Sequence, residues 1–331
     1  MNERQAAIRR SLSTVDVQLL HQCQLSAIGI GEKVVAGRST GEPCIKAFVT
    51  RKRPANVIPS SRMVPASVRG VSTDVEELAA PTSPPWLSFG PGELVGLEIG
   101  NREFHRPMIG GDSVANFRSL TGTLSCAVVD RSTGQLAMLS CNHVLAGLGQ
   151  GVPGDPILQP SFGDGGRIPA AVCGWLARYV PVLFESGTAN LVDAALAQAS
   201  PGGLMPGVGA IGIPTGVQSG NDCSIGQRVF KVGRTTGMTV GTVSAVHVTG
   251  WQMYPPILGG SGAALFKDQI VTTAMAGFGD SGSLLFDEHG NVLGLLFAGS
   301  STNSFYCDIL QVELQMAVEV VTSTSLATGA Q

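Results

Sequence analysis

Three polar residues, His143, Asp193 and Ser281, occur in contexts that suit them to acyl-transfer chemistry. His143 lies in AMLSCNHVLAG, where an apolar run gives way to small residues, so a strand end could hold the backbone while the imidazole faces a cleft. Asp193 lies in the apolar run NLVDAALA. Burying an unpaired carboxylate there would cost roughly several kcal/mol of desolvation free energy, so the group needs a partner. A cationic imidazole is a suitable partner, although backbone N–H groups at a strand end would serve equally well.

Ser281 lies in GFGDSGSLLFD, where the flanking Gly279 and Gly282 allow the sharp turn that exposes a nucleophilic Oγ. The G-x-S-G pattern alone is weak, because GGSG around Ser261 repeats it without a preceding aspartate. GDSG followed at once by an apolar run is more specific. The G-x-S-x-G elbow of α/β-hydrolases does not fit, because residue 283 is a serine and the histidine comes first in the chain.

The motifs CNHVLA, VDAAL, KVGRTTGMTVGTV and GDSGSLLF resemble those of trypsin-like serine proteases, in particular bacterial ones, over residues 112–325. The upstream segment from IGIGEKVVAGRSTGEPCIKAFVTRK to TDVEE is similar to the N-terminal part of a bacterial and plant group of intracellular trypsin-like proteases that includes the plant Narrow Leaf protein. The resemblance implies a serine endopeptidase with protein or peptide substrates and no cofactor or metal. In it Ser281 attacks the carbonyl, His143 moves the proton, Asp193 orients the imidazole, and the N–H groups of Gly279 and Ser281 form the oxyanion hole.

Two further expectations come from the same resemblance. In the bacterial relatives an arginine of the GRTTG motif pairs with the aspartate before the serine, which predicts an ion pair between Arg234 and Asp280. The predicted substrate pocket is formed by Met275, Phe297, Ala298 and Gly299. Because Met275 stands where trypsins carry an acidic residue, we expect a small or apolar P1 side chain rather than Arg or Lys.

Two alternatives keep the same fold. A catalytically silent binding or scaffold protein would retain the triad without cleaving a substrate, and an esterase would use the same acyl-enzyme chemistry on esters. A dinucleotide-binding role is excluded because Gly29-Ile30-Gly31 lacks the third glycine of the motif, and no G-x-x-x-x-G-K sequence occurs.

The elements that must position these residues are predominantly strands. The 44 glycines and 44% hydrophobic content suit short strands joined by tight turns, and strand-like runs recur from Leu120 to residue 299. This pattern predicts an antiparallel barrel or sandwich. With the resemblance it predicts two antiparallel six-stranded chymotrypsin-like β-barrels, residues 112–215 and 216–331, with a C-terminal helix over 308–321.

Residues 1–80 predict a small α+β N-terminal domain, with a helix over 12–22 and strands in 27–52 and 70–78. Residues 81–111, dense in Pro and Gly, predict a linker or covering segment. Because every triad candidate lies further along the chain, we expect residues 1–110 to bind a regulatory partner, cover the cleft or mediate self-assembly. The alternative is that they complete the protease core.

Charge and cysteine content limit the partners and the cellular compartment that we expect for this protein. Residues 1–80 have net charge +4 and residues 81–331 have −7, so no general basic surface is expected to bind nucleic acid. The opening MNERQAAIRRSLSTVDVQLLHQ lacks the apolar core of a signal sequence, and no apolar run long enough for a membrane span follows it. The seven cysteines are odd in number and include no C-x-x-C pair. These features predict a cytoplasmic protein with free thiols and no membrane partner.

Overall fold

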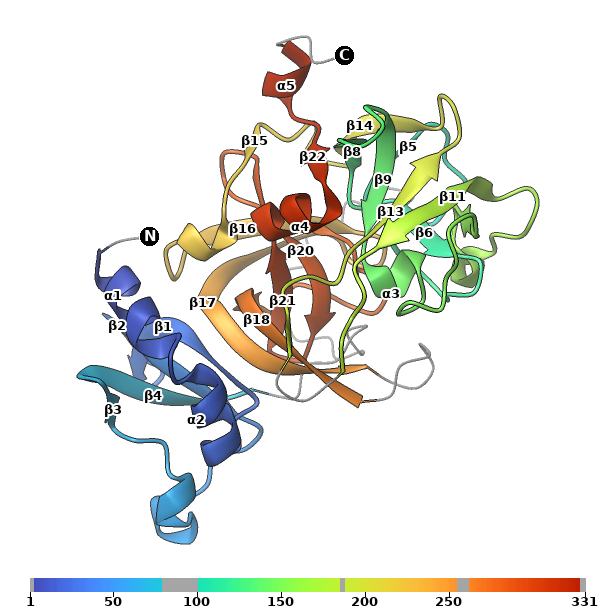
Figure 1. Cartoon of the computed structure of the whole chain (residues 1–331). Helices are drawn as coiled ribbons and strands as arrows, with labels where there is room; N and C mark the ends of the chain where they lie inside the picture. The colour runs from blue at the N-terminus through green and yellow to red at the C-terminus, as the bar shows by residue number, and fades with distance from the viewer. Residues whose placement is uncertain (1–2, 79–100, 185–187, 255–261, 328–331) are drawn as a thin grey trace.

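The computed structural model describes residues 3–78, 101–184, 188–254 and 262–327. In Figure 1 the N-terminal segment (blue), the second barrel (gold to red) and the first barrel (green to yellow) lie side by side in that order. Most of the expectation for residues 81–111 falls outside the described residues. No helix of the described residues is long and apolar enough to cross a bilayer.

The helices and strands run in the following order. The N-terminal segment contains α1 (Glu3–Leu12), α2 (Asp16–Cys23), β1 (Ala27–Val35), β2 (Arg38–Val49), η1 (Ala55–Val57), η2 (Ser60–Arg62), β3 (Ser67–Val68) and β4 (Val71–Glu77). The middle of the chain contains β5 (Met108–Gly110), β6 (Ser113–Asn116), β7 (Gly122–Thr123), β8 (Ala127–Asp130), β9 (Leu136–Ser140), α3 (Asn142–Leu145), β10 (Pro156–Leu158), η3 (Phe162–Asp164), β11 (Val172–Tyr179), β12 (Ala189–Asn190), β13 (Ala195–Ala199) and β14 (Leu204–Val208). The remainder contains β15 (Gly216–Val217), η4 (Gly220–Asp222), β16 (Arg228–Gly233), β17 (Gly237–Tyr254), β18 (Gly262–Thr273), β19 (Leu284–Phe286), β20 (Asn291–Gly299), β21 (Asn303–Asp308), α4 (Ile309–Met316), β22 (Val318–Val320) and α5 (Ser323–Ala327).

The second barrel is a closed ring of antiparallel strands. β16 pairs with β17, and the pairing continues through β18, β21, β20 and β19 back to β16. β20 (NVLGLLFAG) is buried along nearly its whole length, as expected for an apolar run with neighbours on both edges. Closure leaves no free edge among these six strands.

The first barrel closes in the same way. β6 pairs with β7 and β10, and the order continues through β11, β13 and β9 to β8. β7 and β8 are two parts of one segment of chain, which closes the ring. Between them, Ser125 N donates to Leu139 O of β9 at 2.9 Å. The two closed rings confirm the predicted mainly β architecture with two six-stranded antiparallel barrels.

The N-terminal segment is joined to the second barrel by a continuous sheet. β1 pairs antiparallel with β17, with Ile28 opposite Thr249, and the sheet continues outward through β2, β4 and β3. The side chains of Ile8, Leu12 and Leu20 from α1 and α2 belong to the same buried cluster as residues of β17 and β18. This shared core means that removing the segment would expose apolar surface on the second barrel.

Two helix predictions are corrected. The helix expected over 12–22 is two helices, α1 and α2, because the chain turns at residues 13–15, where Val15 N bonds to Leu12 O. The helix expected over 308–321 ends at Met316, since Ala317 takes a left-handed conformation (φ 51°). The chain then forms β22, which pairs with β8 and buries Val318 and Val320 while Glu319 points outward.

Candidate active site

His143 and Asp193 are held against each other by the ends of two neighbouring strands. His143 lies in α3, directly after β9, and Asp193 lies between β12 and β13, which pairs with β9. Nδ1 of His143 is 2.7 Å from Oδ2 of Asp193, and the backbone N–H of His143 donates to Oδ1 at 3.2 Å. His143 is 2% exposed and Asp193 is fully buried. Because the carboxylate accepts from Nδ1–H, Nε2 is the ring nitrogen that carries no proton in the neutral imidazole.

Tyr254 adds a third group to this pair. Its hydroxyl donates to Oδ2 of Asp193 at 2.8 Å, and its ring lies edge-on to His143 with centroids 6.2 Å apart. Burial, together with the negative charge of Asp193, raises the pKa of Tyr254 well above its ordinary value, so the phenol stays protonated and can only donate here. Sequence reasoning missed this residue. A buried tyrosine needs a partner for its hydroxyl, but that partner is 61 positions away in the chain.

Ser281 lies where the turn after β18 meets the first barrel. Its carbonyl accepts from Thr123 N at 2.8 Å, and Gly282 N donates to Leu296 O at 2.8 Å. The thiol of Cys141 donates to the same Leu296 carbonyl at 3.1 Å. These contacts bring the segment that carries His143 against the segment that carries Ser281.

Gly282 is required at this junction. Its φ is +99°, and a Cβ there would lie 2.3 Å from Ser140 Oγ and 2.1 Å from Thr123 O. Ser281 itself is fully buried, and its Oγ has no hydrogen-bond partner among the residues that the structure describes. An unpartnered buried hydroxyl is uncommon in structural roles, since burial without a hydrogen bond costs about 1–3 kcal/mol.

Gly279 and Ser281 also present two unused backbone donors. Within the described part of the chain, neither N–H donates to an acceptor. The turn is held in place by Thr123, whose hydroxyl donates to Gly279 O at 2.8 Å. Gly279 has a φ of +94°, and a Cβ at this position would lie 2.9 Å from Nη1 of Arg234. Two free N–H groups beside a serine Oγ are the arrangement that an oxyanion hole requires.

The expected Arg234–Asp280 ion pair is corrected, because Asp280 pairs with Lys231 instead. Nζ of Lys231 is 3.2 Å from Oδ2 of Asp280, and both side chains are fully buried. The carboxylate also accepts from the N–H groups of Thr235 (2.8 Å), Thr236 (3.2 Å) and Gly277 (2.9 Å) and from the hydroxyl of Thr236 (2.6 Å). Burial lowers the pKa of Lys231, while the charge of Asp280 opposes that change.

Arg234 turns away from Asp280 and forms its ion pair with Asp164 of η3. Its Nε donates to Oδ2 of Asp164 at 2.7 Å. Lys231 lies within β16, whereas Arg234 lies in the turn that follows this strand, so their side chains leave the chain in different directions. The lysine is the one that reaches Asp280.

The residues predicted to form the substrate pocket are all buried. Met275 packs in one hydrophobic cluster, where the hydroxyl of Tyr306 approaches its Sδ at 3.7 Å. Phe297 and Ala298 belong to the other cluster, and the ring of Phe297 lies 4.7 Å from that of Phe266. The role of Met275, Phe297, Ala298 and Gly299 in selecting substrate therefore stays a prediction.

One group of side chains at the site has the composition of a metal centre. Ligand atoms of Cys141, His143 and Asp193 lie within 4.8 Å of one another. However, burial raises the pKa of the Cys141 thiol well above its ordinary value, which keeps it protonated, and Nδ1 of His143 is already bonded to the carboxylate. The donor set therefore favours a hydrogen-bonded dyad over a bound metal ion.

Several solved bacterial proteases have a similar fold. Thermobifida fusca protease A (19% identity, TM-score 0.46), Nocardiopsis protease (20%, 0.46) and Cellulomonas bogoriensis chymotrypsin (19%, 0.44) each match 65% of this chain over 98% of their own length. No family model matches the sequence. No curated protein matches it either. The fold is defined here by the two closed rings of strands rather than by these likenesses, and the resemblance of the N-terminal segment to the bacterial and plant group stays a prediction.

Proposed function

We propose that this protein is a serine endopeptidase that hydrolyses peptide bonds through Ser281, His143 and Asp193. The observation that carries the proposal is the buried 2.7 Å contact between His143 Nδ1 and Asp193 Oδ2. The segment that carries His143 shares the Leu296 carbonyl with the turn that carries Ser281, whose Oγ has no partner and whose N–H, with that of Gly279, is unused among the described residues. Each group alone has a structural explanation. Their convergence at the junction of two barrels favours a catalytic one.

The chemistry follows from these positions. Ser281 Oγ attacks the peptide carbonyl while Nε2 of His143 accepts its proton, and the oxygen that becomes negative is bound by the N–H groups of Gly279 and Ser281. The imidazolium then gives the proton to the leaving amine, which departs and leaves an acyl ester on Ser281. A water molecule attacks the ester by the same route in reverse, and the free serine is restored.

Asp193 and Tyr254 are positioning residues in this scheme. Asp193 fixes the tautomer and stabilises the imidazolium, and Tyr254 holds the carboxylate in turn. With Met275 at the pocket position, a small or apolar P1 side chain is the substrate preference that we propose.

A cytoplasmic setting is part of the same proposal. All seven cysteines are free and buried, as expected for a protein that keeps its thiols reduced. No disulfide is needed to stabilise barrels with cores of this size.

One observation favours the catalytically silent alternative. Ser281 is 0% exposed and His143 is 2% exposed, so access of a substrate to the serine is restricted in this structure. The test is turnover of matched peptide and ester substrates by wild type and Ser281→Ala, together with labelling by a small fluorophosphonate. Labelling with peptide cleavage supports the endopeptidase, ester turnover alone supports the esterase, and no labelling of the wild type supports the silent protein.

A further inference from the structure

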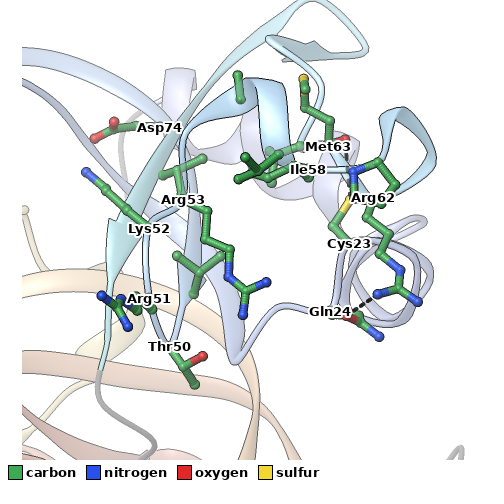
Figure 2. A pocket seen from close by; sticks show the side chains of 16 residues that line it. Cys23, Gln24, Thr50, Arg51, Lys52, Arg53, Ile58, Arg62, Met63 and Asp74 are labelled. Carbon is green, nitrogen blue, oxygen red and sulfur yellow. Dashed lines mark hydrogen bonds between the residues drawn. The ribbon is translucent and has the colours of Figure 1, made fainter.

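A second site lies on the N-terminal segment, away from the triad. It is a pocket of about 500 Å³ between the end of α2, the loop that contains η1 and η2, and β4 (Figure 2). The lining includes residues 49–53, at and after the end of β2, and seven residues between 55 and 64. None of these residues takes part in the proposed catalysis.

The pocket is rich in positive charge. Arg51, Lys52, Arg53 and Arg62 line it, all four are exposed, and none forms an ion pair within the described residues. Figure 2 shows Lys52 and Arg53 reaching out from one turn and Arg62 on the other side beside Gln24. The acidic residue in the lining, Asp74, is already paired with Lys46 at 2.9 Å. The unbalanced charge favours an anionic ligand.

The wall behind these cations is aliphatic. It contains Val49, Val57, Ile58, Val64 and Val75, and the described residues that line the pocket include no aromatic side chain. The described lining offers no ring on which a base could stack, so it has no feature that favours a nucleic acid. A ligand that carries both carboxylates and an aliphatic side chain fits the charge and the wall together.

Among the residues that the structure describes, the pocket also includes a strand edge that is only partly paired. β3 pairs with β4 only at Val71 and Ser72. Leu78 N bonds to Val49 O on the β2 side, and Thr73 N bonds to Ala66 O on the other side. Because alternate residues of a strand direct their N–H and C=O groups to alternate sides, the backbone of Val75 faces away from β2. Val75 therefore presents a backbone donor and acceptor where it lines the pocket.

We propose that this pocket binds an acidic, extended peptide segment of another protein, which adds as a strand along β4. Its carboxylates pair with Arg51, Lys52, Arg53 and Arg62, and an aliphatic side chain packs on Val49, Ile58 and Val75. Strand addition supplies affinity through the main chain, and the charges select acidic sequences. The proposal does not depend on catalysis, because the pocket shares no residue with the triad.

The test uses the full-length Ser281→Ala protein, which binds without cleaving. A fluorescent peptide of alternating Glu and Val is titrated by anisotropy, with matched peptides in which Gln or Lys replaces Glu. We expect binding of the Glu peptide only, weakened by added salt and reduced by about tenfold or more in Arg53→Glu, because a charge reversal turns an attraction into a repulsion. Arg38→Glu, which reverses an exposed charge at the turn between β1 and β2 outside the pocket, is the matched control and should leave binding unchanged.

Three results would overturn the proposal. The first is that the Gln and Glu peptides bind with equal affinity, or that the Glu peptide binds equally well with and without the Arg53→Glu replacement. The second is tighter binding of a single-stranded oligonucleotide, or self-association that Arg53→Glu abolishes, since either would identify a different occupant. The third concerns the strand: a Glu peptide N-methylated at alternate positions must bind more weakly, and equal affinity would rule out addition to β4.

Discussion

The replacement Lys231→Met probes the ion pair that stands behind the serine turn. Lys231 and Asp280 are both fully buried, and methionine keeps much of the lysine's length while removing its charge. Breaking a buried pair by removing one partner costs about 3–5 kcal/mol. We expect the lower end, because Asp280 keeps three backbone N–H donors and the hydroxyl of Thr236.

This loss can be measured as a melting temperature and as a rate. At about 2.1 cal/mol/K per residue over the whole chain, a loss of about 3 kcal/mol lowers Tm by about 4 °C. Asp280 lies between the two predicted oxyanion donors, so a displaced turn should also lower kcat, by up to the roughly 10²–10³-fold seen when one such donor is lost. Thermal unfolding and peptide turnover, measured on the same preparations, give both values.

Two further variants make the reasoning refutable. Lys231→Met combined with Asp280→Asn removes the lone charge and should recover part of the stability lost in the single variant. Arg234→Met should disturb Asp164 and leave the free energy of the Lys231–Asp280 pair intact. The account is wrong if Lys231→Met leaves Tm and kcat unchanged while Arg234→Met lowers both.

Three more predictions concern the remaining contacts of the site. Tyr254→Phe should lower kcat/KM by about tenfold or more, since a hydrogen bond to a charged group is worth about 1.5–3 kcal/mol. The acidic limb of its pH profile should move to higher pH, because the carboxylate without the tyrosine hydroxyl stabilises the imidazolium more strongly, and an unmoved limb would count against a positioning role. Tyr179→Phe is the control, because among the described residues the Tyr179 hydroxyl bonds only to Gly149 O. Asp193→Asn should reduce kcat on the order of 10⁴-fold by losing the correct tautomer, and a loss below tenfold would exclude Asp193 as the orienting group. Burial alone would raise the pKa of Asp164, but hydrogen bonds from Arg234 and Ser113 outweigh burial and lower this pKa in the folded protein. The charged carboxylate therefore stabilises the fold at pH values above its unfolded-state pKa of about 3.9, and this stabilisation disappears as the pH falls through the folded-state pKa. The Tm difference between wild type and Asp164→Asn should therefore be constant at neutral pH and shrink below about pH 4, and a difference that grows in acid would refute this assignment.

Local sequence pattern was sufficient to predict most strands and the architecture. The runs within β16, β17, β18 and β20 are rich in apolar and β-branched residues and bounded by Gly, Asp, Asn or Ser, so the type of these elements is determined locally. The full lengths of β17, 18 residues, and β18, 12 residues, exceed the runs that the sequence marked. The closing of two rings followed from their number and from the family resemblance. The pairing of β1 with β17 was not predictable in this way, because strand partners more than 200 residues apart leave no local trace.

The errors at the site have a similar cause. The lysine of KVGRTTG was visible in the sequence, but choosing Lys231 over Arg234 requires knowing which face of β16 meets the serine turn. Tyr254 was missed because its contact with Asp193 arises from the path of β17, the long strand that also holds the N-terminal segment. Expectations for the catalytic roles of His143, Asp193 and Ser281 stay predictions, as does the division of the chain at residues 80, 111 and 215.

The central claim is that Ser281 is the nucleophile. The most direct test is to react the wild-type protein with a fluorophosphonate and locate the adduct by mass spectrometry of its peptides, with Ser281→Ala and Ser261→Ala as matched controls. Ser261 lies in the other G-x-S-G sequence, outside the described residues. The account predicts one adduct on Ser281, retained in Ser261→Ala and absent from Ser281→Ala. An adduct on another residue, or equal labelling of Ser281→Ala, would contradict it.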